Sequence, residues 1–127
     1  MIKIKWIVPL LISFFLAGCG PDTIFLRPGL DTPSQHVANG NQLLEVGKVD
    51  DAYREFVRAK ELDPNYVKAY VGIGVALGKK GDIDAGMQAL AAAEKMADSA
   101  LEQEAVQKGY AQLNALKHTS QNREKEN

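Results

Sequence analysis

The chain has few of the residues that usually carry out chemistry. Its 127 residues include one cysteine, two histidines and one tryptophan. A single cysteine cannot close an internal disulfide, so packing must hold the fold. The histidines, His36 and His118, are far apart in the sequence, neither with a plausible metal or triad set, and the serines lack a glycine-flanked nucleophile elbow. We therefore expect a protein that is not an enzyme, with no metal ion and no bound cofactor.

An excess of charge of one sign is also missing. Fifteen Lys and Arg residues stand against 16 Asp and Glu residues, which gives a formal net charge of −1, and the basic residues are spread along the chain. A nucleic-acid-binding surface needs a basic stripe or patch, so we expect no nucleic-acid partner. With 46% hydrophobic and 24% charged residues, the composition is typical of one globular domain.

A hydrophobic run of membrane-spanning length is absent as well. The apolar run Ile7–Leu16 has ten residues and contains Pro9, whereas a spanning helix needs about 20. Lys3 and Lys5 precede the run. A basic start followed by a short apolar core is typical of a cleavable secretory signal.

The end of this segment is more specific. Leu16-Ala17-Gly18-Cys19 resembles the lipobox of bacterial lipoproteins. The resemblance implies that residues 1–18 are a signal peptide that is removed, and that Cys19 then carries a diacylglyceryl group and an N-acyl chain. The alternatives are a signal peptide with an incidental cysteine, or a buried thiol, which Gly20 and Pro21 disfavour because they belong to no packed element. In enteric-type bacteria, Gly20 in place of Asp after the cysteine favours the outer membrane, with the chain facing the periplasm.

Residues 19–31 form a predicted tether. Pro21 and Pro28 exclude a helix there, so we expect an extended segment. It contains the apolar cluster Ile24-Phe25-Leu26. This cluster either docks onto the following domain or contacts the bilayer surface or a partner.

From Thr32 onward the sequence repeats with a shift of 34 residues. Small residues fall on small residues and bulky residues on bulky ones: His36 on Tyr70, Val37 on Val71, Gly40 on Gly74, Leu43 on Leu77, Gly47 on Gly81, Ala52 on Gly86, Phe56 on Leu90, Ala59 on Ala93 and Leu62 on Met96. Thirty-four is the period of the tetratricopeptide repeat (TPR), a helix-turn-helix unit. The region resembles that family, with departures at His36, Asn39, Gly86 and Asp98.

The resemblance implies an all-α fold, a short right-handed α-solenoid of two TPR units and a C-terminal capping helix. We expect helices at about 33–46, 49–62, 65–79 and 83–97, and a fifth at about 100–117. The repeats then span about 33–66 and 67–100. The TPR domain covers residues 32–117, and the polar residues 118–127 form a flexible tail. Two units are few for a repeat array, so self-association is possible.

Local signals support these boundaries. Thr32 and Ser99 each begin a capping box, and Asp63 and Pro64 are expected as the cap and the first residue of a helix. Gly47 and Gly81 supply the positive φ that a tight turn requires. The fifth helix carries an apolar stripe that is expected to cover the last repeat: Leu101, Ala105, Val106, Tyr110, Leu113 and Leu116.

Two patterns that suggest chemistry have simpler explanations. The stretch Gly72–Gly81 superficially resembles a phosphate loop but lacks the required GxxxxGK[ST] spacing. The acidic pairs Asp50/Asp51 and Asp82/Asp84 fall at helix starts, where negative charge suits the helix dipole.

In the TPR family the first helix of each unit lines a concave groove that holds peptides or helices. The resemblance implies a candidate partner-binding groove formed by Val37, Asn41, Leu44, Lys68, Val71, Val75, Lys79 and Gln112, with Ala105 and Gly109 at its floor. An apolar strip with lysines suits a segment that carries some acid. The alternative is a solvent-facing surface with no partner.

These expectations combine into one hypothesis. The chain is predicted to be a lipid-anchored, periplasm-facing TPR adaptor, which binds an unidentified protein of a cell-envelope assembly such as a pilus, secretion or cell-wall complex. Its membrane contact is the lipid on Cys19. The alternative is a periplasmic carrier or chaperone whose short groove binds an apolar peptide or lipid.

Overall fold

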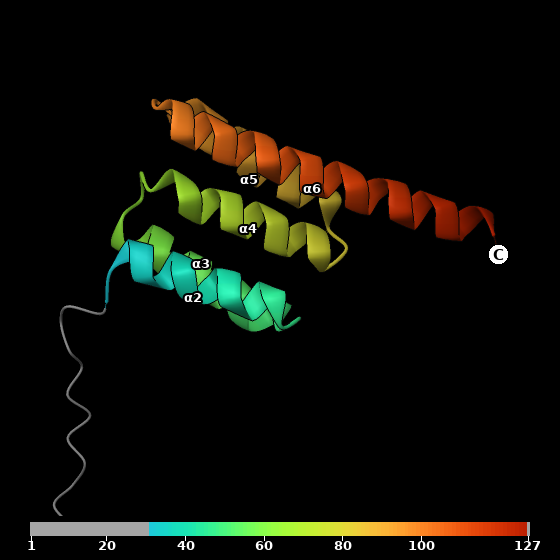
Figure 1. Cartoon of the computed structure of the whole chain (residues 1–127), viewed down its shortest axis with the longest axis horizontal. Coiled ribbons are helices and arrows are strands. Elements are labelled where there is room, and N and C mark those ends of the chain that lie inside the picture. The colour runs from blue at the N-terminus through green and yellow to red at the C-terminus, as the bar shows by residue number, and fades with distance from the viewer. Residues whose placement is uncertain (1–30, 127) are drawn as a thin grey trace, which may run out of the picture.

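The computed structural model describes residues 31–126, and within that range the chain is all-α, with five helices and no strand (Figure 1). The predicted signal peptide, Cys19 and residues 19–30 of the predicted tether lie outside the described residues, as does Asn127. The predictions made for them therefore stay predictions.

The helix boundaries are close to the expected ones. The helices are α2 (Pro33–Glu45), α3 (Val49–Leu62), α4 (Val67–Lys79), α5 (Ile83–Met96) and α6 (Ala100–Lys125). The largest difference is the end of α6, which was expected near Lys117. No glycine or proline follows Lys117 to stop the helix, and the hydroxyls of Thr119 and Ser120 donate hydrogen bonds to helix carbonyls. The helix therefore continues through the polar segment.

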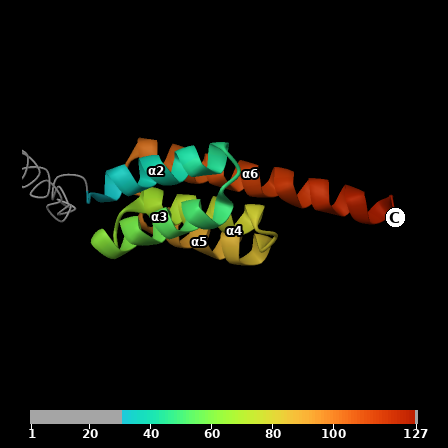
Figure 2. The same cartoon turned by 90° about the horizontal axis from the view of Figure 1, so that it is seen from below.

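The helices lie in two layers (Figure 1). In this view α2, α4 and α6 form the front layer, with α3 behind α2 and α5 behind α6. Consecutive helices contact each other, and α4 contacts each of the other four. Figure 2 shows α6 extending well past the ends of the other helices. The front layer thus combines three helices that are not consecutive in the sequence.

The two helical pairs repeat each other at the level of backbone hydrogen bonds. In both turns a glycine with positive φ follows the first helix, Gly47 at 77° and Gly81 at 98°. The same two hydrogen bonds close each turn, 34 residues apart: Gly47 N to Leu44 O at 3.1 Å and Lys48 N to Leu43 O at 2.8 Å, then Gly81 N to Gly78 O at 3.1 Å and Asp82 N to Leu77 O at 3.0 Å. The period of 34 residues seen in the sequence is therefore also a period of the backbone.

The core of the first pair is built around one ring. Phe56 on α3 is fully buried, as are Ala52 and Ala59 on the same helix. Gly40 on α2 and Gly72 on α4 lie against the Phe56 ring, and a Cβ atom at either position would collide with it. The sequence prediction that small residues make room for Phe56 is confirmed, and Gly72 joins the predicted small residues.

The predicted start of α4 is wrong. Asp63 is the C-terminal cap of α3 rather than the N-terminal cap of α4, and Pro64 lies in the turn before the helix. The Asp63 carboxylate accepts a hydrogen bond from the backbone N–H of Asn65 at 3.0 Å, and Tyr66 N–H donates to the Asp63 carbonyl at 3.1 Å. These bonds close a turn at Asp63, so that α4 begins only at Val67.

The other helix starts agree with the sequence in part. Ser99 and Glu102 form the expected capping box of α6. Thr32 caps α2 by accepting from Gln35 N–H, but the Gln35 side chain donates to Asn39 instead of returning to the cap. The α2 box is therefore only half formed.

The expected apolar stripe of α6 is correct for most of its members. Val106 and Leu113 are buried, and Ala105, Tyr110 and Leu116 are partly buried. Leu101, however, is 75% exposed; it lies in the first turn of the helix and faces solvent. No helix among residues 31–126 combines the length and the apolar character needed to cross a membrane.

Candidate functional site

A single concave surface of about 590 Å³ lies across the front layer of helices. It is lined by all of the residues predicted for the groove and its floor: Val37, Asn41, Leu44, Lys68, Val71, Val75, Lys79, Ala105, Gly109 and Gln112. Glu45, Gly72 and Lys108 complete the lining. We refer to these thirteen residues as the groove.

Helical spacing explains why these residues share one surface. On α4, Lys68, Val71, Val75 and Lys79 follow one another at intervals of three or four residues, which places them on one face of the helix. The contributions of α2 and α6 follow the same rule. Because the three helices lie side by side in one layer, their faces meet in one groove.

The floor of the groove is apolar and low. Val37 is 8% exposed and Val75 5% exposed, so little more than the edge of each side chain reaches the surface. Gly72 lies against the Phe56 ring, and a Cβ atom on Gly109 would lie 2.6 Å from Leu90 Cδ2. Glycines at these positions let the helices pack closely and leave the floor free of bulky side chains.

The rim of the groove is mainly basic. Three lysines, Lys68, Lys79 and Lys108, stand against a single acid, Glu45. Lys108 pairs with Glu104 on its own helix at 2.7 Å, whereas Lys68 and Lys79 form no ion pair within residues 31–126. These two lysines are eleven positions apart on α4, which corresponds to about 16 Å along the helix axis.

Glu45 and Lys108 are the groove residues that sequence reasoning missed. Each follows directly from helical spacing, since Glu45 is adjacent to Leu44 and Lys108 lies three residues after Ala105. The signal was present but the family pattern did not point to it.

The chemistry of the lining suits binding. The groove offers methyl and methylene surfaces at the floor and ammonium groups at the rim, and none of its thirteen residues is a cysteine, serine or histidine. No group of three His, Cys, Asp or Glu residues that could hold a metal ion is found in residues 31–126. The arrangement fits a segment with an apolar side and carboxylates at its edges.

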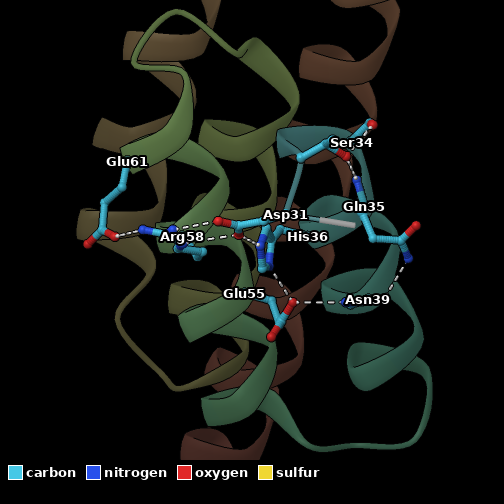
Figure 3. A network of polar contacts seen from close by, with 9 residues as sticks. Asp31, Ser34, Gln35, His36, Asn39, Glu55, Arg58 and Glu61 are labelled. Atoms are coloured by element: carbon cyan, nitrogen blue, oxygen red, sulfur yellow. Dashed lines mark hydrogen bonds and ion pairs between the residues drawn. The ribbon is translucent and has the colours of Figure 1, made fainter. Parts of the chain in front are cut away.

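A polar network stands outside the groove, at the start of α2 (Figure 3). His36, for which the sequence suggested no partner, lies between the carboxylates of Asp31 and Glu55, and Arg58 joins the network through Asp31. The partners are 5 and 19 residues from His36, so no local motif reveals them. Only the packing of α2 on α3 brings them together.

Comparisons of the chain with known protein families, with curated proteins and with solved structures find no match.

Proposed function

We propose that the chain is a lipid-anchored TPR-like adaptor of the bacterial cell envelope, held to a membrane through Cys19 and binding a partner protein in the groove of α2, α4 and α6. The partner contributes a segment with an apolar side and acidic residues. The chain itself carries out no reaction. In this proposal the protein faces the periplasm from the outer membrane and joins a pilus, secretion or cell-wall assembly.

One observation carries the groove part of the proposal. Ten residues selected from the 34-residue pattern line one concave surface, although they come from three separate helices. The repeated turn hydrogen bonds and the two-layer arrangement support the TPR-like reading in the same way. The anchoring part depends on the Leu16–Cys19 motif and the preceding basic and apolar residues.

The charge of the rim provides the test of the groove. Lys68→Glu with Lys79→Glu is expected to abolish capture of the partner in intact cells, because both exposed ammonium groups facing the partner's carboxylates become acidic. A photo-crosslinking residue at Asn41 measures the capture, and mass spectrometry identifies the protein held. Lys95→Glu, an equally exposed change on α5 outside the groove, is the matched control and should leave capture unchanged.

Equal crosslinking in the double variant and in the wild type would contradict the groove proposal. Helicity measured by circular dichroism separates loss of the partner from loss of the fold. Both lysines are exposed and form no ion pair within residues 31–126, so the double variant should keep the helical signal of the wild type.

A carrier of apolar cargo is the second candidate, favoured by the apolar floor of Val37, Val71 and Val75. A carrier would purify with lipid or with a mixture of peptides, which native mass spectrometry detects as added mass. An adaptor would show a single protein partner whose binding weakens as salt rises, because the rim charges are exposed and screened.

The anchor has its own test. Cys19→Ser is expected to eliminate incorporation of labelled fatty acid, because serine lacks the sulfur to which the diacylglyceryl group attaches. It should also prevent the cleavage that depends on that lipid. Labelling of cells, followed by intact-mass measurement, checks both expectations. Asp22→Ser, outside the four motif positions, is the control and should be labelled like the wild type; full labelling of Cys19→Ser would contradict the proposal.

A further inference from the structure

His36 is held between two carboxylates from opposite sides of its ring. Its Nδ1 lies 2.8 Å from Glu55 Oε2 on α3, and its Nε2 lies 2.8 Å from Asp31 Oδ1, in the residue just before the α2 cap (Figure 3). The side chain is 16% exposed. Both ring nitrogens therefore make short contacts to groups that, when ionised, only accept hydrogen bonds.

This geometry specifies the protonation state of His36. A neutral imidazole has one N–H donor and one acceptor nitrogen, whereas an ionised carboxylate offers acceptors alone. Only the doubly protonated ring can donate to both carboxylates at once. Burial by itself would lower the pKa of His36, but the hydrogen bonds to Asp31 and Glu55 outweigh it and raise the pKa above the ordinary value.

The neighbouring groups keep both carboxylates ionised through the neutral range. Arg58 Nη2 donates to Asp31 Oδ2 at 2.8 Å and, with His36, lowers the pKa of Asp31. Asn39 Nδ2 donates to Glu55 Oε2 at 3.2 Å. Among the groups in contact, His36 is thus the one whose charge changes near neutral pH.

The remaining charges of the packed helices lie elsewhere. On α3, Glu61 is 3.4 Å from Arg58 and extends the network away from His36. The charged residues of α4, which also contacts α2, are Lys68 and Lys79, and both line the groove. The charge facing His36 is therefore that of Asp31 and Glu55, with Arg58 behind Asp31.

We propose that Asp31, His36, Glu55 and Arg58 form a proton-controlled clasp, which fastens the residue where the N-terminal segment joins the helices to the α2–α3 pair. The clasp is closed while His36 is protonated on both nitrogens. When the ring loses one proton, one of its two carboxylate contacts loses its hydrogen, and Asp31 is then held by Arg58 alone. The clasp sets the direction in which the preceding segment leaves the helices, and it does so independently of the groove.

The sign of the pH dependence follows from the raised pKa of His36. The contribution of the clasp is complete below the unfolded-state value of about 6.5. It is lost as the pH rises through the higher pKa of the folded state. Asp31 should therefore be most firmly held in mildly acidic solution and less so in alkaline solution.

Nuclear magnetic resonance of the ¹⁵N-labelled full chain in a non-ionic detergent tests the clasp. We expect the His36 ring to titrate with a midpoint above about 6.5, and the heteronuclear NOE of the Asp31 amide to fall with the same midpoint. Asp31→Asn and Glu55→Gln should each lower the His36 midpoint. Arg58→Gln, an exposed change, should enlarge the loss of NOE at Asp31, because it removes the contact that remains at high pH.

Asp51→Asn is the control variant. Asp51 pairs with Arg54 on the same helix and does not contact the clasp, so its removal should leave the His36 midpoint unchanged. A His36 midpoint that is at or below 6.5, or that ignores both Asp31→Asn and Glu55→Gln, would overturn the proposal. An Asp31 NOE that is constant across the His36 titration, in the wild type and in Arg58→Gln alike, would overturn it as well.

Discussion

Phe56→Ala is expected to lower the free energy of unfolding by about 3–5 kcal/mol, the range for truncating a buried aromatic ring in a core. Phe56 is fully buried on α3 and is the largest of the fully buried side chains in the part of the chain that the structure describes. A typical domain has about 5–15 kcal/mol of stability in total. The substitution should therefore remove a large share of it.

The surroundings of Phe56 explain why the loss should fall in the upper part of that range. The ring lies against Gly40 on α2 and Gly72 on α4, and glycines have no side chains that could move into the vacated space. Closing the cavity would require whole helices to shift, and α4 is fixed by contacts to the other four helices. The cost of a truncation depends on how well the site can collapse, and this site can collapse little.

Urea unfolding of the full chain in a non-ionic detergent, followed by circular dichroism, measures the effect. Phe56→Leu should cost much less, because it retains most of the buried volume and Leu90 occupies the equivalent position of the second pair. Val46→Ala, at a residue that is 69% exposed, is the surface control and should change the free energy by at most about 0.5 kcal/mol. A loss below about 1.5 kcal/mol for Phe56→Ala would contradict the packing described here.

Much of the fold could be predicted from the sequence because its signals are local or periodic. Gly47 and Gly81 mark turns through a conformation that other residues avoid, and both adopt it. The groove residues were predictable because a helical period alone places Lys68, Val71 and Val75 on one face. What the period does not show is how deep that face lies or which charges border it, and this is why Glu45 and Lys108 were missed.

The misses have physical reasons of their own. Asp63 followed by Pro64 has the sequence of a helix start, but the same carboxylate closes a turn by accepting from Asn65 N–H, and no local signal separates the two outcomes. The contacts of His36 depend on the packing of α2 against α3, which joins Glu55 to it from 19 residues away. Leu101 continued an apolar stripe, yet it lies beyond the reach of α4 and α5. Tertiary placement decided all three.

Gly86 is the position where the repeat pattern and the structure predict opposite results. In the first pair the equivalent residue is Ala52, so the pattern favours alanine at position 86. Helix propensity agrees, since glycine in a helix interior costs about 1 kcal/mol relative to alanine. From the sequence alone, Gly86→Ala should stabilise the protein by about that amount.

The packing of α4 against α5 predicts a loss instead. A Cβ atom on Gly86 would lie 2.7 Å from the carbonyl oxygen of Gly74 and 2.8 Å from Leu113 Cδ2. The first of these is a backbone atom of the facing helix, which cannot rotate out of the way as a side chain would. The contact is reciprocal, because a Cβ atom on Gly74 would lie 2.9 Å from the carbonyl oxygen of Gly86. The two helices therefore cross glycine on glycine, more closely than alanine allows.

We expect Gly86→Ala to destabilise the protein by about 1–2 kcal/mol, since overpacking a core typically costs about 1–3 kcal/mol and the gain in propensity offsets part of it. The same urea titration measures this change, with Gln88→Ala on the exposed side of α5 as a control for propensity alone. A stabilised Gly86→Ala variant would mean that α4 and α5 lie farther apart than the structure has them. The groove would then change too, because α4 forms its floor and a Cβ atom at position 86 presses on Leu113, which holds α6 in place.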